Sequence, residues 1–566
     1  MTVWVLGDQL HPDAGPLADC SPDEERVLLV ESRGFARRMP YHSQKLTLVF
    51  AAMRHFRDDL RDAGYEVEYR RAETFADALD AHFADYPDDL LCAMEPASHG
   101  AGDRLRELVA DAAGEKGHLT LVENDLFCCS PDEFDDRFPD AIPRQETFYR
   151  WMRTRTGYLM EGDESAEGDG KSAEGDGESA GRDGEAAEET RPAGGEWNYD
   201  EQNRRFPPAD YEFPDPPAFD ATETTEAVAD WVRETFETWG DDALGVADAD
   251  PTDDARTDLT DFADDEADDA SEGTDAGPAR FRWPVTREQA LRSLDRFVAE
   301  RLSEFGPYQD AMLARSWSGN HALLSPALNL GLLRPEEVIE RAIEAYETDE
   351  APVESVEGFV RQVLGWREFV RHAYRRRMPE MREANHLDAT RDLPPLYYDG
   401  ETDMHCLETV VGRVWDRGYS HHIERLMILS NFALTYGADP HELNRWFHFG
   451  YVDAYHWVTT PNVVGMGTFA TDALSTKPYA ASANYVDKMS DFCGDCRYDP
   501  DQTTGEDACP FNALYWDFLA ENDETLRENH RMGLTYHNLD RKGDDELDAI
   551  RERAAEVREL AADGEL

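Results

Sequence analysis

The sequence predicts two domains of different fold class. An α/β domain with a doubly wound parallel sheet is expected over residues 1–125, and a large all-α domain over residues 281–540. In the first part, short apolar runs alternate with helical segments, as in a parallel sheet covered by helices. In the second part, apolar residues recur at spacings of three and four almost throughout. The chain of 566 residues is long enough for each domain to have a complete core.

The strands of the first domain are expected in four apolar runs, at 3–6, 27–30, 67–69 and 119–122, with helices at 45–63 and 75–83. In doubly wound sheets, ligands bind beyond the carboxyl ends of the strands. The segments found there are 7–10, 31–32 and 95–96. Taken alone, these segments are equally well explained as ordinary loop ends.

Residues 126–280 are expected to connect the domains, and they contain two acidic stretches at about 162–195 and 241–277. Such segments cannot bury enough apolar surface to offset the entropy that is lost on ordering. Both are therefore predicted to be disordered insertions. Residues 541–566 are predicted to be a charged tail that forms a frayed helix.

The all-α domain is predicted from seven periodic segments, at 286–305, 334–346, 356–377, 409–415, 420–434, 440–447 and 509–521. Proline and glycine separate these segments at 306–307, 325–326, 394–395 and 461. A single large helical domain explains this pattern.

The charge balance is extreme, with 121 acidic against 56 basic residues and a formal net charge of −65. Such a balance normally argues against a nucleic-acid partner, because phosphate would be repelled. The alternative is adaptation to very high salt, where charges are screened beyond about 3 Å at 1 M. The few lysines and many acidic and alanine residues favour adaptation to salt.

The sequence contains no stretch of roughly 18 uninterrupted apolar residues, so we expect no membrane span. The first ten residues lack a basic region and a cleavage site, and they are interpreted as a strand. We therefore expect a cytoplasmic protein, where a reducing environment favours metal ligation by cysteine over disulfide bonds.

Four cysteines in the helical half can bind one metal centre. They are Cys406, Cys493, Cys496 and Cys509, with the spacing C-x86-C-x2-C-x12-C. Four thiolates suit a [4Fe–4S] cluster or a structural zinc ion. From the spacing alone, unliganded cysteines also remain an alternative.

A pair of histidines, His421 and His422, lies within an apolar helical pattern, where polar residues need a partner or a function. An imidazole near neutral pH is suited to proton transfer. The alternative is a pair of core histidines that serve only packing.

Several blocks together resemble the cryptochrome/photolyase family. They are VWVLGDQL at 3–10, FGPYQDAM at 305–312, LLSPALNLGLLRPEEV at 323–338, VRQVLGWREFVR at 360–371 and WFHFGYVDAYHWVTTPNVVGMGTFA at 446–470. The paired histidines and four cysteines are similar to its iron–sulfur bacterial branch. That branch contains prokaryotic (6-4) photolyases, cryptochromes and deoxyribodipyrimidine photolyase-related proteins.

The resemblance implies an N-terminal antenna domain and a helical FAD-binding domain. The residues expected to hold FAD are Tyr308, Ser325, Leu328, Asn329, Gln362, Trp366, Arg367, Asn431, Asp453, Tyr455 and Trp457. Asp453 would accept hydrogen bonds from the flavin or pair with Arg367. Without the resemblance, the aromatic residues would be interpreted as core and this pair as a structural ion pair.

The resemblance also assigns the remaining groups. The four cysteines would hold a [4Fe–4S] cluster, His421 or His422 would transfer a proton, and Trp446 and Tyr398 would carry electrons. An antenna chromophore, which in this branch is 6,7-dimethyl-8-ribityllumazine, would contact Asp8, Gln9, Glu31, Tyr41, His42 and Lys45. Tyrosine is harder to oxidise than the tryptophan expected at position 398.

The implied function is light-driven DNA repair, in which photoexcited reduced FAD passes an electron to a (6-4) pyrimidine photoproduct. The alternative is a blue-light photoreceptor with the same cofactors and no repair turnover. Seven arginines against few acidic residues between 361 and 382 predict a basic patch for UV-damaged DNA. We expect a monomer.

Overall fold

The computed structural model describes residues 1–22, 24–114, 118–161, 191–244 and 279–566. Most of the two stretches that were predicted to be disordered insertions lies outside the described residues. The first of these stretches was expected to extend to residue 195, but the structure describes the chain again from residue 191. There β7 (Arg191–Pro192) pairs in antiparallel register with β6 (Met160–Glu161). Residues 191–195 therefore belong to the folded part.

The N-terminal domain contains a five-stranded parallel sheet with the order β3-β2-β1-β4-β5. Its strands are β1 (Thr2–Val5), β2 (Arg26–Ser32), β3 (Glu66–Ala72), β4 (Leu91–Met94) and β5 (Leu119–Val122). The chain leaves β1 in both directions across the sheet, which is the doubly wound arrangement. The prediction of a parallel α/β domain is confirmed.

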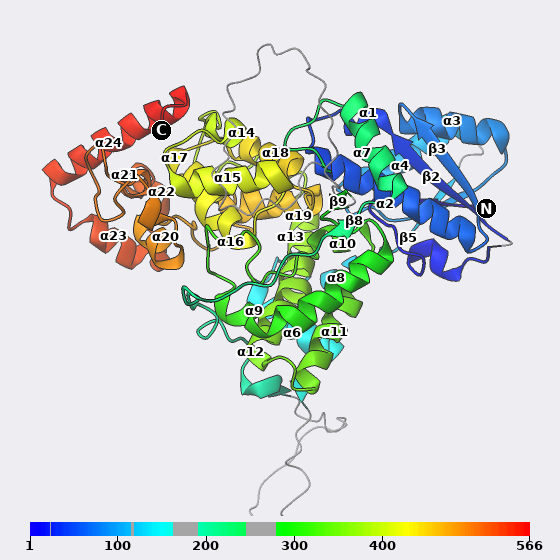
Figure 1. The fold of residues 1–566 in the computed structure, drawn as a ribbon, viewed down its shortest axis with the longest axis horizontal. Helices are drawn as coiled ribbons and strands as arrows, with labels where there is room; N and C mark the ends of the chain where they lie inside the picture. Colours follow the sequence, from blue (N-terminus) through cyan, green and yellow to red (C-terminus); the bar gives the residue numbers. More distant parts are fainter. Residues whose placement is uncertain (23, 115–117, 162–190, 245–278) are drawn as a thin grey trace, which may run out of the picture.

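Helices cover both faces of this sheet, as Figure 1 shows at the blue end of the chain. Trp4, Leu28 and Val30 pack under α3 (Phe75–Asp85) and α4 (Ala101–Ala113). Val3, Val5, Val27 and Leu29 belong to the large core shared with α2 (Ser43–Asp62). Alternate side chains of each strand thus face opposite layers, and both layers are apolar.

The connecting residues are also folded. Their described part contains α5 (Pro131–Arg137), α6 (Gln145–Thr156), α7 (Glu223–Thr235) and the strand β8 (Phe219–Asp220), which pairs with β9 (Arg280–Phe281). The short helix α1 (Arg33–Ala36) precedes α2 in the N-terminal domain. Helix α7 packs along α2, while α6 packs against the helical domain. The connecting residues therefore pack partly on the N-terminal domain and partly on the helical domain.

The helical domain was predicted correctly as a class. Its helices are α8 (Arg287–Glu300), α9 (Leu302–Tyr308), α10 (Ser325–Leu330), α11 (Pro335–Glu347), α12 (Val353–Val360), α13 (Glu368–Arg377), α14 (Leu396–Asp399), α15 (His405–Arg417), α16 (His422–Glu424), α17 (Asn431–Tyr436), α18 (Pro440–Gly450), α19 (His456–Thr460), α20 (Ala483–Met489), α21 (Pro510–Glu521), α22 (Asp523–Leu526), α23 (Gly533–Leu539) and α24 (Asp544–Asp563).

The part of the chain that the structure describes contains three π-helical turns. They are η5 (Arg361–Arg367), η7 (Arg425–Ser430) and η8 (Pro461–Gly467). Two of them lie inside the expected helices 356–377 and 420–434. Wide turns of this kind are rare and occur frequently at functional sites.

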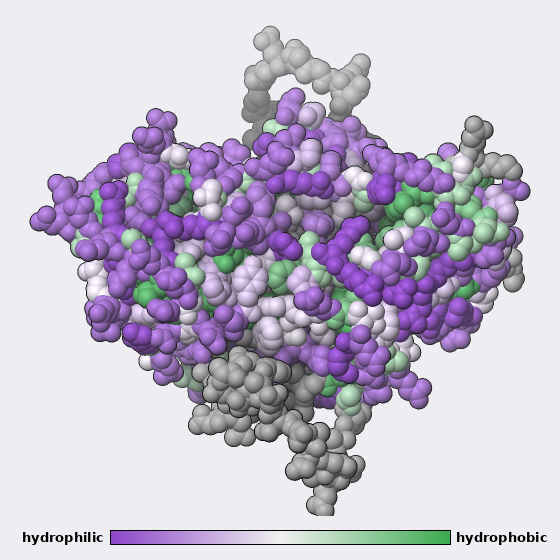
Figure 2. Space-filling model, turned by 90° about the horizontal axis from the view of Figure 1, so that it is seen from above, coloured by the Kyte–Doolittle hydropathy of each residue, from purple (hydrophilic) through white to green (hydrophobic). Residues whose placement is uncertain are grey.

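The C-terminal segment is not a frayed tail, which corrects the prediction for residues 541–566. Helix α24 packs on α21 through a buried stripe that contains Ile550, Ala554, Val557 and Ala561. Its Arg558 donates to Asp517, and both side chains are buried. Among the described helices, none is long and apolar enough to span a membrane. The face seen from above in Figure 2 is mostly hydrophilic.

Candidate flavin site

A cavity of about 310 Å³ lies in the helical domain. All three π-helical turns contribute side chains to its wall, together with α10 and α19. Of the eleven residues expected to hold FAD, eight line this cavity: Ser325, Leu328, Asn329, Gln362, Trp366, Arg367, Asp453 and Trp457. The structure thus brings together residues that are up to 132 positions apart, from 325 to 457.

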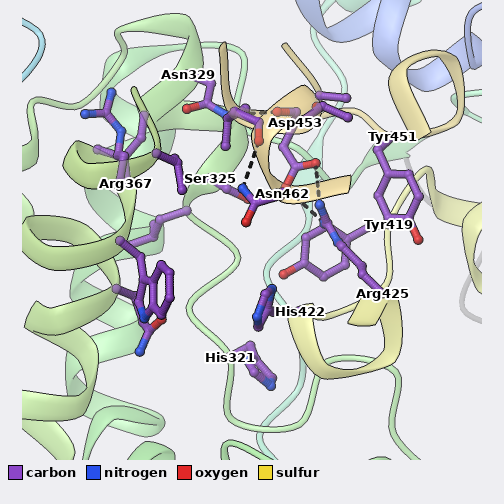
Figure 3. A pocket seen from close by; sticks show the side chains of 18 of the residues that line it. His321, Ser325, Asn329, Arg367, Tyr419, His422, Arg425, Tyr451, Asp453 and Asn462 are labelled. Atoms are coloured by element: carbon purple, nitrogen blue, oxygen red, sulfur yellow. Dashed lines mark hydrogen bonds and ion pairs between the residues drawn. The ribbon is translucent and has the colours of Figure 1, made fainter. Parts of the chain in front are cut away.

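An ion pair between Arg425 and Asp453 is the main charged feature of the cavity (Figure 3). Its two nitrogen–oxygen contacts are both 3.0 Å, which is a bidentate geometry. The Ser325 hydroxyl donates to the same carboxylate at 2.6 Å, and Asn329 donates to the Asp453 carbonyl at 2.9 Å. Burial lowers the pKa of Arg425, but the charge and hydrogen bond of Asp453, together with Tyr451 and Tyr419, raise it above its usual value, so the guanidinium stays charged.

The pair between Arg367 and Asp453, one of the two alternatives predicted for Asp453, does not form, because Arg425 takes the place of Arg367. Arg367 instead donates to Glu368 at 3.0 Å, and its guanidinium lies over the rings of Phe127 and Trp457. Its Nε atom is buried and has no hydrogen-bond partner among the described residues. Arg367 therefore retains a donor for a bound group.

Three residues expected to hold FAD lie outside the cavity wall. Tyr308 packs edge-on against Tyr211. Asn431 exchanges hydrogen bonds with the backbone of Ala481, at 2.9 and 3.0 Å. Tyr455 faces Lys45 of the N-terminal domain.

The adjacent histidines differ in their surroundings. His422 lines the cavity, and burial followed by the charge of Arg425 lowers its pKa to about 4. His421 is 1% exposed and lies outside the cavity wall, with Nε2 3.3 Å from a carboxylate oxygen of Glu424. Glu424 forms a buried ion pair with Arg413. Only one of the pair faces the cavity.

The sequence analysis did not assign several residues of the wall to the site: His321, Tyr419, Ser430 and Asn462. Tyr451 and Arg425 also line the cavity, and Arg425 lies over the rings of Tyr419 and Tyr451. Asn462 and Tyr451 fall within the block 446–470, and His321 lies two residues before the start of the block at 323–338. That proximity is the signal from which these three could have been found.

A row of aromatic rings leads from the cavity. The ring centroids of Tyr451, in the wall, and Trp446 are 5.9 Å apart, and those of Trp446 and Trp239 are 6.1 Å apart. Trp239 lies 5.0 Å from Trp415. Tyr398 is 41% exposed and stacks on Phe449 at 6.5 Å. The row therefore runs through Trp239, a residue that the sequence analysis did not single out.

The four cysteines of the predicted metal centre are neighbours. Cys406 lies near the start of α15 and Cys509 directly before α21, with Cys493 and Cys496 in one short turn. Burial raises the pKa of the Cys406 thiol well above its usual value, and the other three thiols raise it further. Four thiolates in this arrangement would repel one another, and a cationic iron–sulfur cluster is the kind of centre that stabilises them. Within the described residues, however, no three His, Cys, Asp or Glu side chains are arranged closely enough to hold a metal ion.

The residues expected to contact an antenna chromophore already have partners. Glu31 accepts from Arg54 at 3.0 Å, from Arg71 at 2.9 Å and from Tyr69 at 2.6 Å. Burial raises the pKa of Glu31, but these hydrogen bonds and charges lower it below its usual value. The carboxylate is fully enclosed by protein groups.

The other antenna candidates lie near the boundary with the helical domain. His42 contacts the carbonyl of Trp415 at 2.8 Å, and Lys45 lies over the ring of Tyr41. Gln9 points to backbone carbonyls at the end of β4. Burial raises the pKa of Asp8 to about 6.

The arginine-rich segment 361–382 is not a free basic patch, which corrects the prediction. Its arginines at 361, 367, 375 and 376 form ion pairs with carboxylates, and Arg371 donates to the carbonyl of Cys129. Arg377 and Arg382 remain exposed. Four of the seven arginines of this segment are therefore paired with carboxylates, two of them with the same one, Asp135.

Sequence comparison links these features to known proteins. The model of the deoxyribodipyrimidine photo-lyase-related protein family matches residues 3–170 and 187–243. A (6-4) photolyase from Agrobacterium fabrum is 36% identical over 565 residues, which is 98% of each chain. The chain belongs to the cryptochrome/photolyase family.

Solved structures of the cryptochrome/photolyase family have the same fold. A bacterial class III photolyase from Agrobacterium tumefaciens matches with a TM-score of 0.54 at 14% identity, covering 100% of this chain and 96% of that one. The cryptochrome of Synechocystis sp. PCC6803 matches with a TM-score of 0.55 at 13% identity, covering 99% and 98%. Both likenesses concern the fold alone.

Membership of the cryptochrome/photolyase family makes the chain a photolyase-type flavoprotein, which implies FAD binding. The cavity fits such a group. Its wall contains aromatic rings, a bidentate ion pair and two buried nitrogens without a partner among the described residues, Arg367 Nε and His321 Nε2. Mostly apolar pockets with a few convergent polar groups are typical of cofactor sites.

Proposed function

We propose that this flavoprotein repairs (6-4) pyrimidine photoproducts in UV-damaged DNA under light. The observation that carries the proposal is the position of His422, which faces the cavity next to the Arg425–Asp453 pair. The full-length similarity to a (6-4) photolyase supports it. Bound FAD would supply the electron for repair when it is reduced and excited by light.

The residues of the chain would orient the ligands and control the proton. Asp453 is held by Arg425 and Ser325, so its carboxylate is fixed for hydrogen bonding. The pKa of His422 near 4 makes its imidazole neutral at pH 7. An anionic group in the cavity favours the protonated form, so ligand binding would prepare His422 as a proton donor.

Further cofactors follow from the same proposal. Cys406, Cys493, Cys496 and Cys509 would hold a [4Fe–4S] cluster, which their number supports; the four side chains would have to come closer together than the structure places them. Trp446 would carry electrons to the cavity through Tyr451, while Tyr398, exposed and stacked on Phe449, would be an outer donor at most. A lumazine antenna would require Glu31 and Lys45 to exchange their present partners.

One experiment tests the function. The purified protein, loaded with reduced FAD at high salt, is irradiated with an oligonucleotide that carries a single (6-4) photoproduct. We expect restored thymines in the light and none in the dark. A protein that binds FAD, responds to light and restores no thymines would be a photoreceptor, a function that the cryptochrome-like fold also allows.

A further inference from the structure

His321 lines the cavity, and the proposed function gives its imidazole no role. It comes from the loop before α10, and Figure 3 shows it beside His422, at the end of the cavity opposite Asn329. Its Nε2 atom is buried and has no hydrogen-bond partner among the described residues. A buried polar atom of this kind costs free energy unless a ligand satisfies it.

The ring of His321 is held in place by a stacking contact. It stacks on the ring of His421, with centroids 4.5 Å apart and an interplanar angle of 14°. His421 is anchored by Glu424 at 3.3 Å, and Glu424 by Arg413. Arg413 also donates to backbone carbonyls in the loop that leads to His321. The orientation of His321 is therefore fixed before any ligand binds.

Arg301, next to His321, forms no ion pair with another residue that the structure describes, and it gives this end of the cavity a positive charge. Arg301 donates to the carbonyl of His321 at 3.2 Å and to two further carbonyls, so its charge is not paired by these hydrogen bonds. Arg425 lines the same cavity, and the carboxylates of Asp453 and Glu424 are each bound to an arginine. An anionic group is the ligand that such a wall favours.

Electrostatics agree with this geometry. Burial lowers the pKa of His321 well below its usual value, and His421, His422, Arg301 and Arg425 lower it further. The imidazole is therefore neutral, and it can donate one N–H to an acceptor without adding a charge to the wall. A hydrogen bond to a charged oxygen is stronger than one between neutral groups.

We propose that His321 binds a phosphate group of the ligand in this cavity, and that His421 is a positioning residue that holds the His321 ring by stacking. This proposal rests on the proposed function, because the phosphate belongs either to the flavin dinucleotide or to damaged DNA. His422 is then the proton donor of the histidine pair, and His421 does not transfer a proton.

The first test measures binding in the dark. FAD and riboflavin, which lacks phosphate, are titrated into the flavin-free full-length protein, and a lesion-bearing oligonucleotide is titrated into the FAD-loaded protein. His321→Phe keeps a flat ring for the stack but removes the donor. We expect it to weaken FAD or the oligonucleotide about 10- to 100-fold, with riboflavin unchanged. His321→Gln, which keeps an N–H, should recover part of the loss.

FAD and the oligonucleotide are titrated separately, so the result identifies the source of the phosphate. Weaker FAD binding assigns the phosphate to the flavin dinucleotide, and weaker oligonucleotide binding assigns it to DNA. If neither affinity falls more than about twofold, or if riboflavin weakens as much as FAD, the phosphate contact is disproved. His441→Asn serves as the control, because His441 contacts the carbonyl of Ala384 and does not line the cavity. Its affinities should equal those of the wild type.

The second test separates stacking from proton transfer. His421→Phe keeps a ring against His321, whereas His421→Asn keeps a polar group near Glu424 and loses the stack. We expect His421→Phe to bind the phosphate ligand within about threefold of wild type, and His421→Asn to lose about tenfold. Equal losses in both variants would disprove the positioning role. No light is used, so a wild-type protein without repair activity would overturn only the proposed function.

Discussion

The ion pair between Arg425 and Asp453 is the residue-scale feature on which the cavity depends. Asp453→Asn keeps the size of the side chain but leaves Arg425 without its carboxylate. Removing one partner of a buried pair costs about 3 kcal/mol, because the other charge stays desolvated. We expect lower FAD content in the purified protein and a lower thermal unfolding midpoint, measured by circular dichroism and flavin absorbance.

Asp416→Asn is the matched control, because Asp416 pairs with Arg417 at 3.0 Å while its side chain is 45% exposed. Exposed pairs contribute little to stability. If the two variants lost FAD and stability to the same extent, the Arg425–Asp453 pair would have no special role.

The sequence could identify residues of the cavity where they fall in continuous blocks, such as Ser325 and Asn329. It could not choose the partner of Asp453, since Arg367 and Arg425 each lie on a helical segment of the same domain. That choice depends on how η5 and η7 are oriented around the cavity. His321 stayed unassigned for the same reason, because its stacking partner is 100 positions away.

At the scale of elements, the contact between η7 and η8 shapes the wall. A Cβ atom on Gly467 would lie 2.7 Å from the Ser430 hydroxyl oxygen and 2.9 Å from its Cβ. Gly467→Ala should therefore push these turns apart and cost about 1–3 kcal/mol, as overpacking does elsewhere. We expect a lower denaturant midpoint and weaker FAD binding.

Gly412→Ala is the control for this prediction. Gly412 lies within α15, and an added Cβ would meet nothing within 4 Å. Alanine is favoured over glycine in a helix interior by about 0.5–1 kcal/mol, so this variant should be slightly more stable. A loss of the same size at both positions would show that the close contact between η7 and η8 is not its cause.

Hydrophobic periodicity predicted the existence of most helices but not their internal geometry. A π-helical turn differs from an α-helical one by a single residue, and the apolar spacing continues through η5 and η7 almost unchanged. The tail helix α24 was misjudged because its many charges hide a narrow stripe of small apolar residues. That stripe is evident only against its partner α21.

At the scale of the whole molecule, composition indicated charge but not its distribution. The net charge of −65 and the arginine-rich segment were both evident in the sequence. The structure shows that carboxylates such as Asp135, which pairs with Arg375 and Arg376, neutralise that segment locally. A basic run predicts a basic surface only when its side chains lack internal partners, which is a tertiary property.

The two domains are joined by a buried lysine. Lys45 on α2 is 6% exposed and donates to the carbonyls of His448 and Ala454 in the helical domain, both at 2.7 Å. Burial lowers its pKa to about 7, against a slight opposing effect of Asp453. The ordinary value in an unfolded chain is about 10.4.

This difference predicts how stability depends on pH. Between pH 7 and about 10.4, the unfolded chain keeps the Lys45 proton while the folded protein releases it, so rising pH favours the folded state. Below pH 7 both states are protonated and this contribution is constant. Lys45→Met removes it, so the thermal midpoint of wild type relative to the variant should rise between pH 7 and 10 at constant high salt. The exposed Lys488, changed to Met, should give a parallel pH profile. If the gap between wild type and Lys45→Met did not change with pH, the ammonium group would have an ordinary pKa despite its burial, and its two carbonyl contacts would be sufficient to replace water.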